Sequence, residues 1–176
     1  VIGAYKKEKG YLDILKVAEI FKNNKIKIIC YGSGDYRKFN HVKSKKKLVN
    51  IFFNNFDKNL SNKIKNYDLL LHLSKREGLP VSVMQSLTRG LPVICYNIRG
   101  NNDLVIDKNN GYFINTYKEV VNKINYLNLE NKTFNKMRIN ASNSIDKDFS
   151  KKNINLRLFN IIRNYEKNLS YEFRVR

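Results

Sequence analysis

Residues 66–114 constrain the fold more than any other stretch of the chain. An apolar run, Tyr67–Leu73, is followed by a short polar loop, an amphipathic segment, Val81–Thr88, and a second apolar run, Val93–Tyr96. Short apolar runs between polar flanks are typical of strands that are buried on both faces of a parallel sheet. The order strand, tight loop, helix, strand therefore predicts a βαβ unit.

Pro80 and Gly90 mark the ends of the helix in this unit. Pro80 is expected at the first helical position, because it has no N–H to leave unpaired and its φ already suits a helix. Gly90 is expected just after the last helical residue, where a left-handed backbone is common. The first turn of the predicted helix therefore lies next to the polar loop Ser74–Gly78.

The rest of the chain continues the alternation of strands and helices. Strands are predicted at 1–5, 26–31, 49–53 and 112–114, helices at 11–21, 58–65, 101–106, 117–127, 132–145 and 151–169, and a helix or loop at 35–47. This order predicts an α/β fold, a doubly wound parallel sheet with helices on both faces. We expect residues 1–170 to form one domain and residues 171–176 to be a frayed tail.

The loop before the predicted helix is the candidate binding site. Ligands of open α/β sheets bind outside the carboxyl ends of the strands. Free backbone N–H groups and a partial positive charge at a helix N-terminus suit a phosphate or diphosphate. Gly78 allows a ligand to approach the backbone, and Glu77 and Gln85 bracket the helix end. A nucleotide-sugar is of suitable size and chemistry for this arrangement.

Five short motifs occur in this order and match one known pattern without insertions or deletions: Ser74, EGLP at 77–80, GLPV at 90–93, GNNDL at 100–104 and NG at 110–111. They resemble the donor-binding motif of GT-B retaining glycosyltransferases of the family 4 type, above all those of capsular and exopolysaccharide biosynthesis. The resemblance implies a Rossmann-like, C-terminal donor domain without the N-terminal acceptor domain. Because the chain begins at the family's Gly-x-x-x-x-x-Lys-Gly stretch and lacks an initiator Met, we expect an excised domain or a fragment.

The resemblance also assigns roles to residues. Lys9 is expected to reach the donor diphosphate and stabilise the charge that develops on the leaving nucleotide. Glu77 is expected to contact the donor sugar, as a binding and positioning group rather than a nucleophile. The expected nucleotide-sugar contacts are Gly32, Ser74, Gly78, Leu79, Pro80, Val81 and Gln85. No cofactor and no metal are expected, since the nucleotide-sugar is the substrate and no DxD motif is present.

Two positions depart from the family pattern. Ala4 stands where an Arg for the diphosphate is usual, and Gln85 stands where a second Glu accepts from the ribose. Hydrogen bonds to charged groups contribute about 1.5–3 kcal/mol, against about 0.5–1.5 kcal/mol for neutral ones. We therefore expect weakened, not abolished, nucleotide binding. His72, near the end of the first apolar run, is interpreted as structural.

Composition limits the function classes further. The net charge of +19 comes from 34 basic and 15 acidic residues. Abundant Lys, Asn, Ile and Tyr suit an A/T-rich genome, and peripheral contact with an anionic membrane is an alternative explanation of the charge. The basic run 43–47 has no interleaved aromatics to stack bases, so no nucleic-acid binding is expected. Cys30 and Cys95 fall in predicted buried strands, which argues against a disulfide or a metal site.

These observations favour the donor domain of a hexosyltransferase of bacterial surface polysaccharide assembly, inactive when isolated. The donor would be a UDP-sugar and the acceptor a lipid-linked saccharide held by the N-terminal domain, at the cytoplasmic face of the membrane. Two alternatives stay open: a non-catalytic sugar-nucleotide-binding or assembly module, and a basic protein that binds anionic surfaces. A sugar-nucleotide epimerase on the same architecture is a weaker option, because it would need more acidic groups in the cleft.

Overall fold

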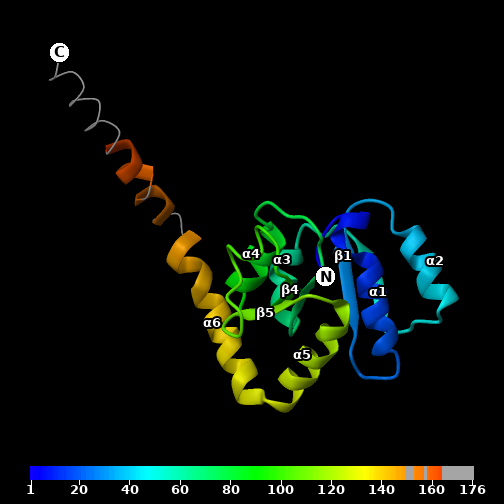
Figure 1. Cartoon of the computed structure of the whole chain (residues 1–176). Helices are drawn as coiled ribbons and strands as arrows, with labels where there is room; N and C mark the ends of the chain where they lie inside the picture. Colours follow the sequence, from blue (N-terminus) through cyan, green and yellow to red (C-terminus); the bar gives the residue numbers. More distant parts are fainter. Residues whose placement is uncertain (150–152, 157, 164–176) are drawn as a thin grey trace.

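The computed structural model describes residues 1–149, 153–156 and 158–163. Strands and helices alternate along most of the chain (Figure 1). The strands are β1 (Ile28–Gly32), β2 (Ile51–Asn55), β3 (Leu70–His72), β4 (Val93–Tyr96) and β5 (Gly111–Ile114). The helices are η1 (Lys7–Lys9), α1 (Tyr11–Ile20), α2 (Arg37–Lys45), α3 (Leu60–Lys63), η2 (Ile64–Asn66), α4 (Val81–Thr88), α5 (Tyr117–Leu129) and α6 (Asn131–Phe149).

Within the described residues, the five strands form two parallel sheets. β1 pairs with β2, and β4 lies between β3 and β5, with all three pairings parallel. The parallel direction confirms the prediction from the strand–helix alternation, since each return to the sheet edge needs a crossover helix. The architecture is therefore the predicted Rossmann-like α/β fold.

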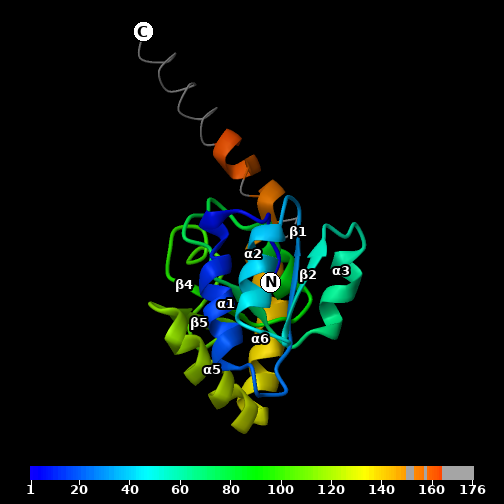
Figure 2. The same cartoon turned by 90° about the vertical axis from the view of Figure 1, so that its right-hand side faces the viewer.

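Helices cover both faces of the strands, which is why β4 is an unbroken apolar run. Ile94 and Tyr96 pack in a core cluster with side chains of α1 and α5, whereas Val93 and Cys95 pack in a second cluster with side chains of α4 and α6. Successive side chains of a strand point to opposite faces, so a strand with two covered faces has no polar positions. Figures 1 and 2 show these helices around the strands. Cys30 and Cys95 are buried free thiols, as predicted.

The βαβ unit is the best-predicted part of the fold. α4 and β4 have the predicted bounds, while β3 is shorter than the predicted Tyr67–Leu73. Tyr67 instead follows η2, and its N–H donates to the carbonyl of Ile64 at 3.1 Å. Pro80 is not the first helical residue: with ψ at 108° it is extended and caps a helix that begins at Val81.

The helix predicted at 101–106 does not form, and this segment is a series of turns. One helical-type bond remains, from the Val105 N–H to the Asn101 carbonyl at 2.8 Å, and buried side-chain amides bond to other backbone groups of the segment. Asn101 Nδ2 donates to the Tyr96 carbonyl at 2.9 Å, and Asn110 Oδ1 accepts from the N–H of Ile106 at 2.7 Å. Asn side chains compete with a helix for backbone partners in this way, and the amphipathic pattern alone does not reveal it.

Of the last two predicted helices, the first is longer than predicted and the second lies only partly within the described residues. The helix predicted at 132–145 is α6, which extends to Phe149. Of the helix predicted at 151–169, residues 153–156 and 158–163 are helical, and they continue the line of α6 away from the body (Figure 1). The remainder of that helix and the predicted tail at 171–176 lie outside the described residues.

Candidate functional site

The loop between β3 and α4 meets the turn before α1 at the carboxyl end of β3. Gly10 makes this approach possible: its φ is +74°, and a Cβ added there would lie 1.8 Å from the carbonyl oxygen of Leu73. Only glycine fits such a position, since both the backbone conformation and the contact exclude a side chain. The close approach brings Lys9, the residue before Gly10, to the edge of the loop.

Hydrogen bonds fix the loop to the same turn. Ser74 Oγ donates to the carbonyls of Glu8 and Arg76, both at 3.2 Å, and the N–H of Lys75 donates to the Glu8 carbonyl at 2.7 Å. Ser74 is 1% exposed. Its side chain therefore shapes the loop from inside, and the ligand contact that the resemblance implies for it stays a prediction.

The two residues predicted to be catalytic meet in an ion pair, although they are 68 positions apart in the sequence. Lys9 Nζ lies 2.7 Å from Glu77 Oε1, with 27% of the Lys9 side chain and 10% of the Glu77 side chain exposed. His72 Nε2 lies 3.2 Å from the same oxygen, and its ring is almost fully buried. Sequence reasoning interpreted His72 as structural and did not predict this contact.

The surroundings of Glu77 strongly favour its ionised form. Burial alone would raise the pKa of this carboxyl, but interactions with His72, Lys9 and Ser74 outweigh burial and lower the pKa from 4.5 to about 2. Nearby positive charges and hydrogen-bond donors stabilise a carboxylate in this way. Glu77 is therefore an anion at neutral pH, and it holds the Lys9 ammonium beside the loop.

The N-terminal end of α4 is open and rich in free donors. The backbone N–H groups of Gly78, Leu79 and Val81 have no hydrogen-bond partner within the part of the chain that the structure describes. Leu79 is 45% and Val81 62% exposed. Together with the partial positive charge of the helix end, these N–H groups can bind an anion by donating hydrogen bonds to it. Gln85 is exposed on the same helix, one turn further on.

Gly100 packs a third segment against the loop, and Gly78 leaves the opposite side open. At Gly100, where φ is +85°, an added Cβ would lie 2.0 Å from the Gly78 carbonyl oxygen and 3.3 Å from Pro80 Cδ. At Gly78 an added Cβ would have no neighbour within 4 Å. The loop is therefore packed against Gly100 on one side, and on the other side, at Gly78, a ligand can approach it.

A second charged cluster anchors the loop and was not predicted. Lys75 Nζ lies 2.5 Å from Asp13 Oδ2 and 4.1 Å from the centre of the Tyr96 ring, and Tyr96 OH donates to Asp13 Oδ2 at 2.9 Å. Lys16 also contacts Asp13. Burial would raise the pKa of Asp13, but the hydrogen bonds from Lys75, Lys16 and Tyr96 lower it overall.

Gly32, the remaining predicted contact, lies at the carboxyl end of β1. An added Cβ there would lie 2.0 Å from the Gly3 carbonyl oxygen, so packing against the N-terminal segment is a sufficient reason for a glycine. In residues 1–149, 153–156 and 158–163, no three His, Cys, Asp or Glu side chains gather as a metal ion would need.

A comparison with protein families shows to which family the chain belongs. The family described as "Glycosyl transferases group 1" matches residues 1–144. The chain belongs to this family. The group 1 match covers the complete site, from Lys9 to Gln85, and the segment 98–111 that supports it. No curated protein matches the chain.

Solved glycosyltransferase structures share the fold of this group 1 chain at low sequence identity. TarM of S. aureus, in complex with Fondaparinux, alpha-GlcNAc-glycerol and UDP, has a TM-score of 0.82 and 22% identity over 90% of this chain and 34% of TarM. Anabaena HepE with UDP and glucose has a TM-score of 0.82 and 17% identity over 92% of this chain and 47% of HepE. The C-terminal domain of LpcC, a group 1 protein of Francisella tularensis, has a TM-score of 0.73 and 17% identity over 85% and 86% of the two chains.

The solved structures establish the fold of the chain, and the family match establishes its family. It spans 34% of TarM and 47% of HepE, but 86% of the LpcC domain.

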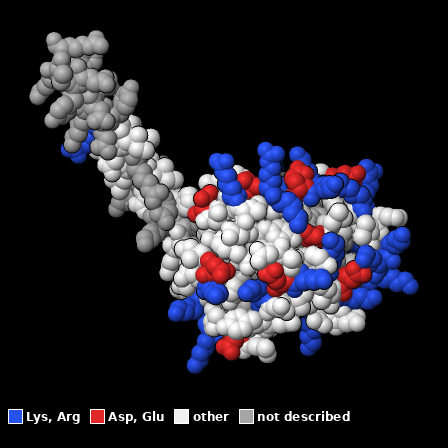
Figure 3. Space-filling view, viewed as in Figure 1, with Lys and Arg blue, Asp and Glu red and all other residues white. Residues whose placement is uncertain are grey.

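Its basic side chains do not gather in one patch on the face shown in Figure 3, where acidic groups lie between them. No helix in the described part of the chain has the length and hydrophobicity to cross a bilayer.

Proposed function

We propose that this chain binds a nucleotide-sugar donor, specifically a UDP-sugar, at the N-terminal end of α4. The observation that carries the proposal is the Lys9–Glu77 ion pair, with 2.7 Å between Nζ and Oε1. Three free backbone N–H groups lie beside this pair. These groups suit a diphosphate that is linked to a sugar. The ammonium and the free N–H groups bind phosphate oxygens, and the carboxylate accepts hydrogen bonds from sugar hydroxyls.

The proposed binding mode exchanges one partner of Lys9 for another. The diphosphate accepts from the N–H groups of Gly78, Leu79 and Val81, and the ammonium of Lys9 turns from Glu77 to a phosphate oxygen. Its partial exposure and long side chain allow this movement. The Lys9 charge then stabilises the negative charge that develops on the departing nucleotide. Glu77 is left to accept from the hydroxyls of the donor sugar.

The solved neighbours support the donor class, since their structures hold UDP together with glucose or alpha-GlcNAc-glycerol. We further propose that the chain is the donor domain of a retaining hexosyltransferase of the family 4 type. Its acceptor would be a lipid-linked saccharide bound by an N-terminal domain, in the assembly of bacterial capsular or exopolysaccharide at the cytoplasmic face of the membrane. Because half of the cleft would belong to that domain, the chain alone should bind donor weakly and transfer no sugar.

Calorimetric titration tests the proposal. UDP is titrated into the wild type and then into Lys9→Ala and Glu77→Ala. GDP and ADP, which carry other bases, are titrated as controls. We expect selective UDP binding that Lys9→Ala weakens, because that variant removes a diphosphate contact. Glu77→Ala should reduce the affinity for UDP-glucose more than the affinity for UDP. Absence of binding to all three nucleotides would refute the donor-site proposal for this chain.

A further inference from the structure

Basic residues are unevenly distributed along the chain, although both signs of charge mix on the face shown in Figure 3. Of the 34 basic and 15 acidic residues, nine basic residues and one acidic residue lie between positions 20 and 56. That acidic residue, Asp35, pairs with Arg37, which leaves the lysines of the segment without a carboxylate inside it. Because like charges repel one another, an anionic partner would stabilise such a segment.

The fold gathers most of these lysines at the amino ends of β1 and β2. The Lys46–Glu19 ion pair holds the C-terminal end of α2 beside the C-terminal end of α1. Asn50 Nδ2 donates to the Ala18 carbonyl at 2.9 Å, and the Ile28 N–H donates to the Asn50 carbonyl at 2.8 Å. The loops before the two strands therefore lie together. We call this surface the basic edge, and its lysines are Lys22, Lys25, Lys27, Lys43, Lys45, Lys46 and Lys47.

The basic edge combines unpaired positive charge with apolar side chains. Six of its seven lysines are exposed, and Lys43 is half-buried. Among the described residues, only Lys46 of this set has a carboxylate partner. Val49 is 73% and Phe52 39% exposed, and Lys43 Nζ lies 5.2 Å from the centre of the Phe52 ring. A partner of this surface therefore needs negative charge and tolerance of apolar groups.

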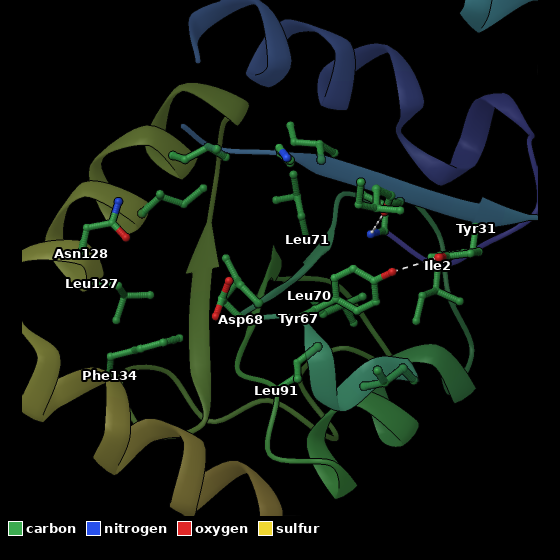
Figure 4. Close-up of a pocket in the computed structure, with 18 of the residues that line it drawn as sticks. Ile2, Tyr31, Tyr67, Asp68, Leu70, Leu71, Leu91, Leu127, Asn128 and Phe134 are labelled. Atoms are coloured by element: carbon green, nitrogen blue, oxygen red, sulfur yellow. Dashed lines mark hydrogen bonds between the residues drawn. The ribbon is translucent and has the colours of Figure 1, made fainter. Parts of the chain in front are cut away.

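The apolar cavity nearby adds nothing to this exposed surface. It has a volume of about 720 Å³ and lies between β1 and β3, with Lys25 and Lys27 among its lining residues. Figure 4 shows Leu70, Leu71 and Leu127 around the space, and each of these side chains is at most 6% exposed. The apolar lining of the cavity therefore belongs to the interior.

We propose that the basic edge binds the surface of an anionic lipid bilayer. Clusters of about four to eight basic residues attract acidic headgroups, and each lysine near such a surface strengthens binding about fivefold. Val49 and Phe52 enter the headgroup region between the lysines, as the apolar side chains of interfacial segments do. The association is peripheral, because the lysine ammonium groups stay in the headgroup layer.

Two other partners fit the basic edge less well. A second copy of this chain would place the lysines of both copies face to face, and like charges oppose that contact. A nucleic acid would use the lysines but not Val49, which has no aromatic face on which a base can stack. The Phe52 ring is covered by the Lys43 ammonium, and the exposed Phe56 lies beyond the carboxyl end of β2.

The basic edge is separate from the proposed donor site. It surrounds the amino ends of β1 and β2, and the amino ends of β1 and β3 lie on the same side, since Lys27 and Asp68 line one cavity. The Lys9–Glu77 pair lies at the carboxyl end of β3. The two sites share no residue, so vesicle binding and nucleotide binding are measured independently and either proposal can fail alone.

Flotation of the full chain with lipid vesicles tests the proposal. One set of vesicles contains about 30% phosphatidylglycerol in phosphatidylcholine, and the other contains phosphatidylcholine alone. Lys47→Gly removes one charge from the basic edge at a position with φ of +52°, which glycine adopts without strain. Lys108→Gly is the matched control: Lys108 is also exposed and has φ of +61°, but it precedes β5, at the far side of the other sheet.

We expect the wild type to bind the phosphatidylglycerol vesicles and not those of phosphatidylcholine alone. Lys47→Gly should weaken this binding about fivefold, and Lys108→Gly should leave it unchanged. Both variants should melt close to the wild type, because relief of the left-handed backbone offsets the added flexibility of glycine. Val49→Ser should weaken vesicle binding about threefold, since an apolar contact is lost.

Four results would overturn the proposal. The first two are no binding to the phosphatidylglycerol vesicles, and equal weakening by Lys47→Gly and Lys108→Gly. The third is tighter binding to a DNA duplex than to the vesicles at equal phosphate concentration, together with no effect of Val49→Ser, which would identify a nucleic-acid surface. The fourth is a dimer in sedimentation that Lys47→Gly strengthens, which would identify a second copy of the chain as the partner.

Discussion

Replacing Glu77 by Gln should destabilise the fold in a pH-dependent way, because the ionised carboxylate is stabilised by its surroundings. The pKa of Glu77 falls from 4.5 to about 2 in the folded chain. Each unit of difference corresponds to about 1.4 kcal/mol, which sets an upper bound of about 3 kcal/mol. Solvent reaches the pair through the exposed part of Lys9, and screening reduces the value to about 1–2 kcal/mol.

The sign follows from the direction of the pKa change. A carboxyl whose folded pKa is lower than its unfolded pKa contributes stability above the unfolded value and loses it as pH falls towards the folded value. For Glu77 the window runs from about pH 4.5 down to about pH 2. The difference in unfolding free energy between wild type and Glu77→Gln should therefore be largest at pH 7 and shrink steadily below pH 4.5.

Urea unfolding of both proteins at several pH values from 7 to 3 measures this difference. Asp35→Asn is the matched control, since Asp35 pairs with Arg37 on the surface and both side chains are exposed. Its stability difference should be slight at every pH, because exposed ion pairs contribute little. A Glu77→Gln difference that stays constant between pH 7 and pH 3, or that is absent at pH 7, would refute the account of the Lys9–Glu77–His72 cluster.

Three further variants examine the site. Gln85→Glu should tighten UDP binding about fivefold in calorimetry, since a charged acceptor adds about 1 kcal/mol over an amide; unchanged or weaker binding contradicts the ribose contact. Gly100→Ala should cost about 1–3 kcal/mol of stability in urea unfolding, because its Cβ would lie 2.0 Å from the Gly78 carbonyl oxygen, whereas Gly78→Ala should leave stability unchanged. Asp13→Asn should lower stability by about 1 kcal/mol and speed amide exchange in the loop 74–79 more than in β5. An equal increase of the exchange rate in the loop and in β5 would show that Asp13 does not anchor the loop.

The sequence predicts those features that depend on local signals. The helix Val81–Thr88 and the strand Val93–Tyr96 have the predicted bounds because proline, glycine and apolar periodicity all act within a few residues. The motif resemblance also selected Lys9 and Glu77, which the structure brings to 2.7 Å. Their roles in binding and transfer stay predictions.

Contacts between distant segments could not be predicted in this way. Nothing in the run that contains His72 indicates that its ring meets Glu77, and nothing in α1 indicates that Asp13 meets Lys75. Both depend on where Gly10 lets α1 approach β3, which is a property of the folded chain. The turns at 101–106 were missed for a related reason, since Asn110 Nδ2 donates to the Leu104 carbonyl from outside the segment.

In the proposed binding mode, His72 would allow one carboxylate to serve two partners in turn. Lys9 and His72 both approach the Oε1 atom of Glu77, at 2.7 Å and 3.2 Å. Without His72, turning the ammonium to a diphosphate would remove the cation that pairs with this largely buried anion, and that loss would oppose donor binding. With the buried ring of His72 still in contact, the carboxylate keeps a neighbour while Lys9 moves. The proposed exchange is then less costly than the strength of the Lys9–Glu77 pair suggests, and Glu77 stays oriented for a sugar hydroxyl.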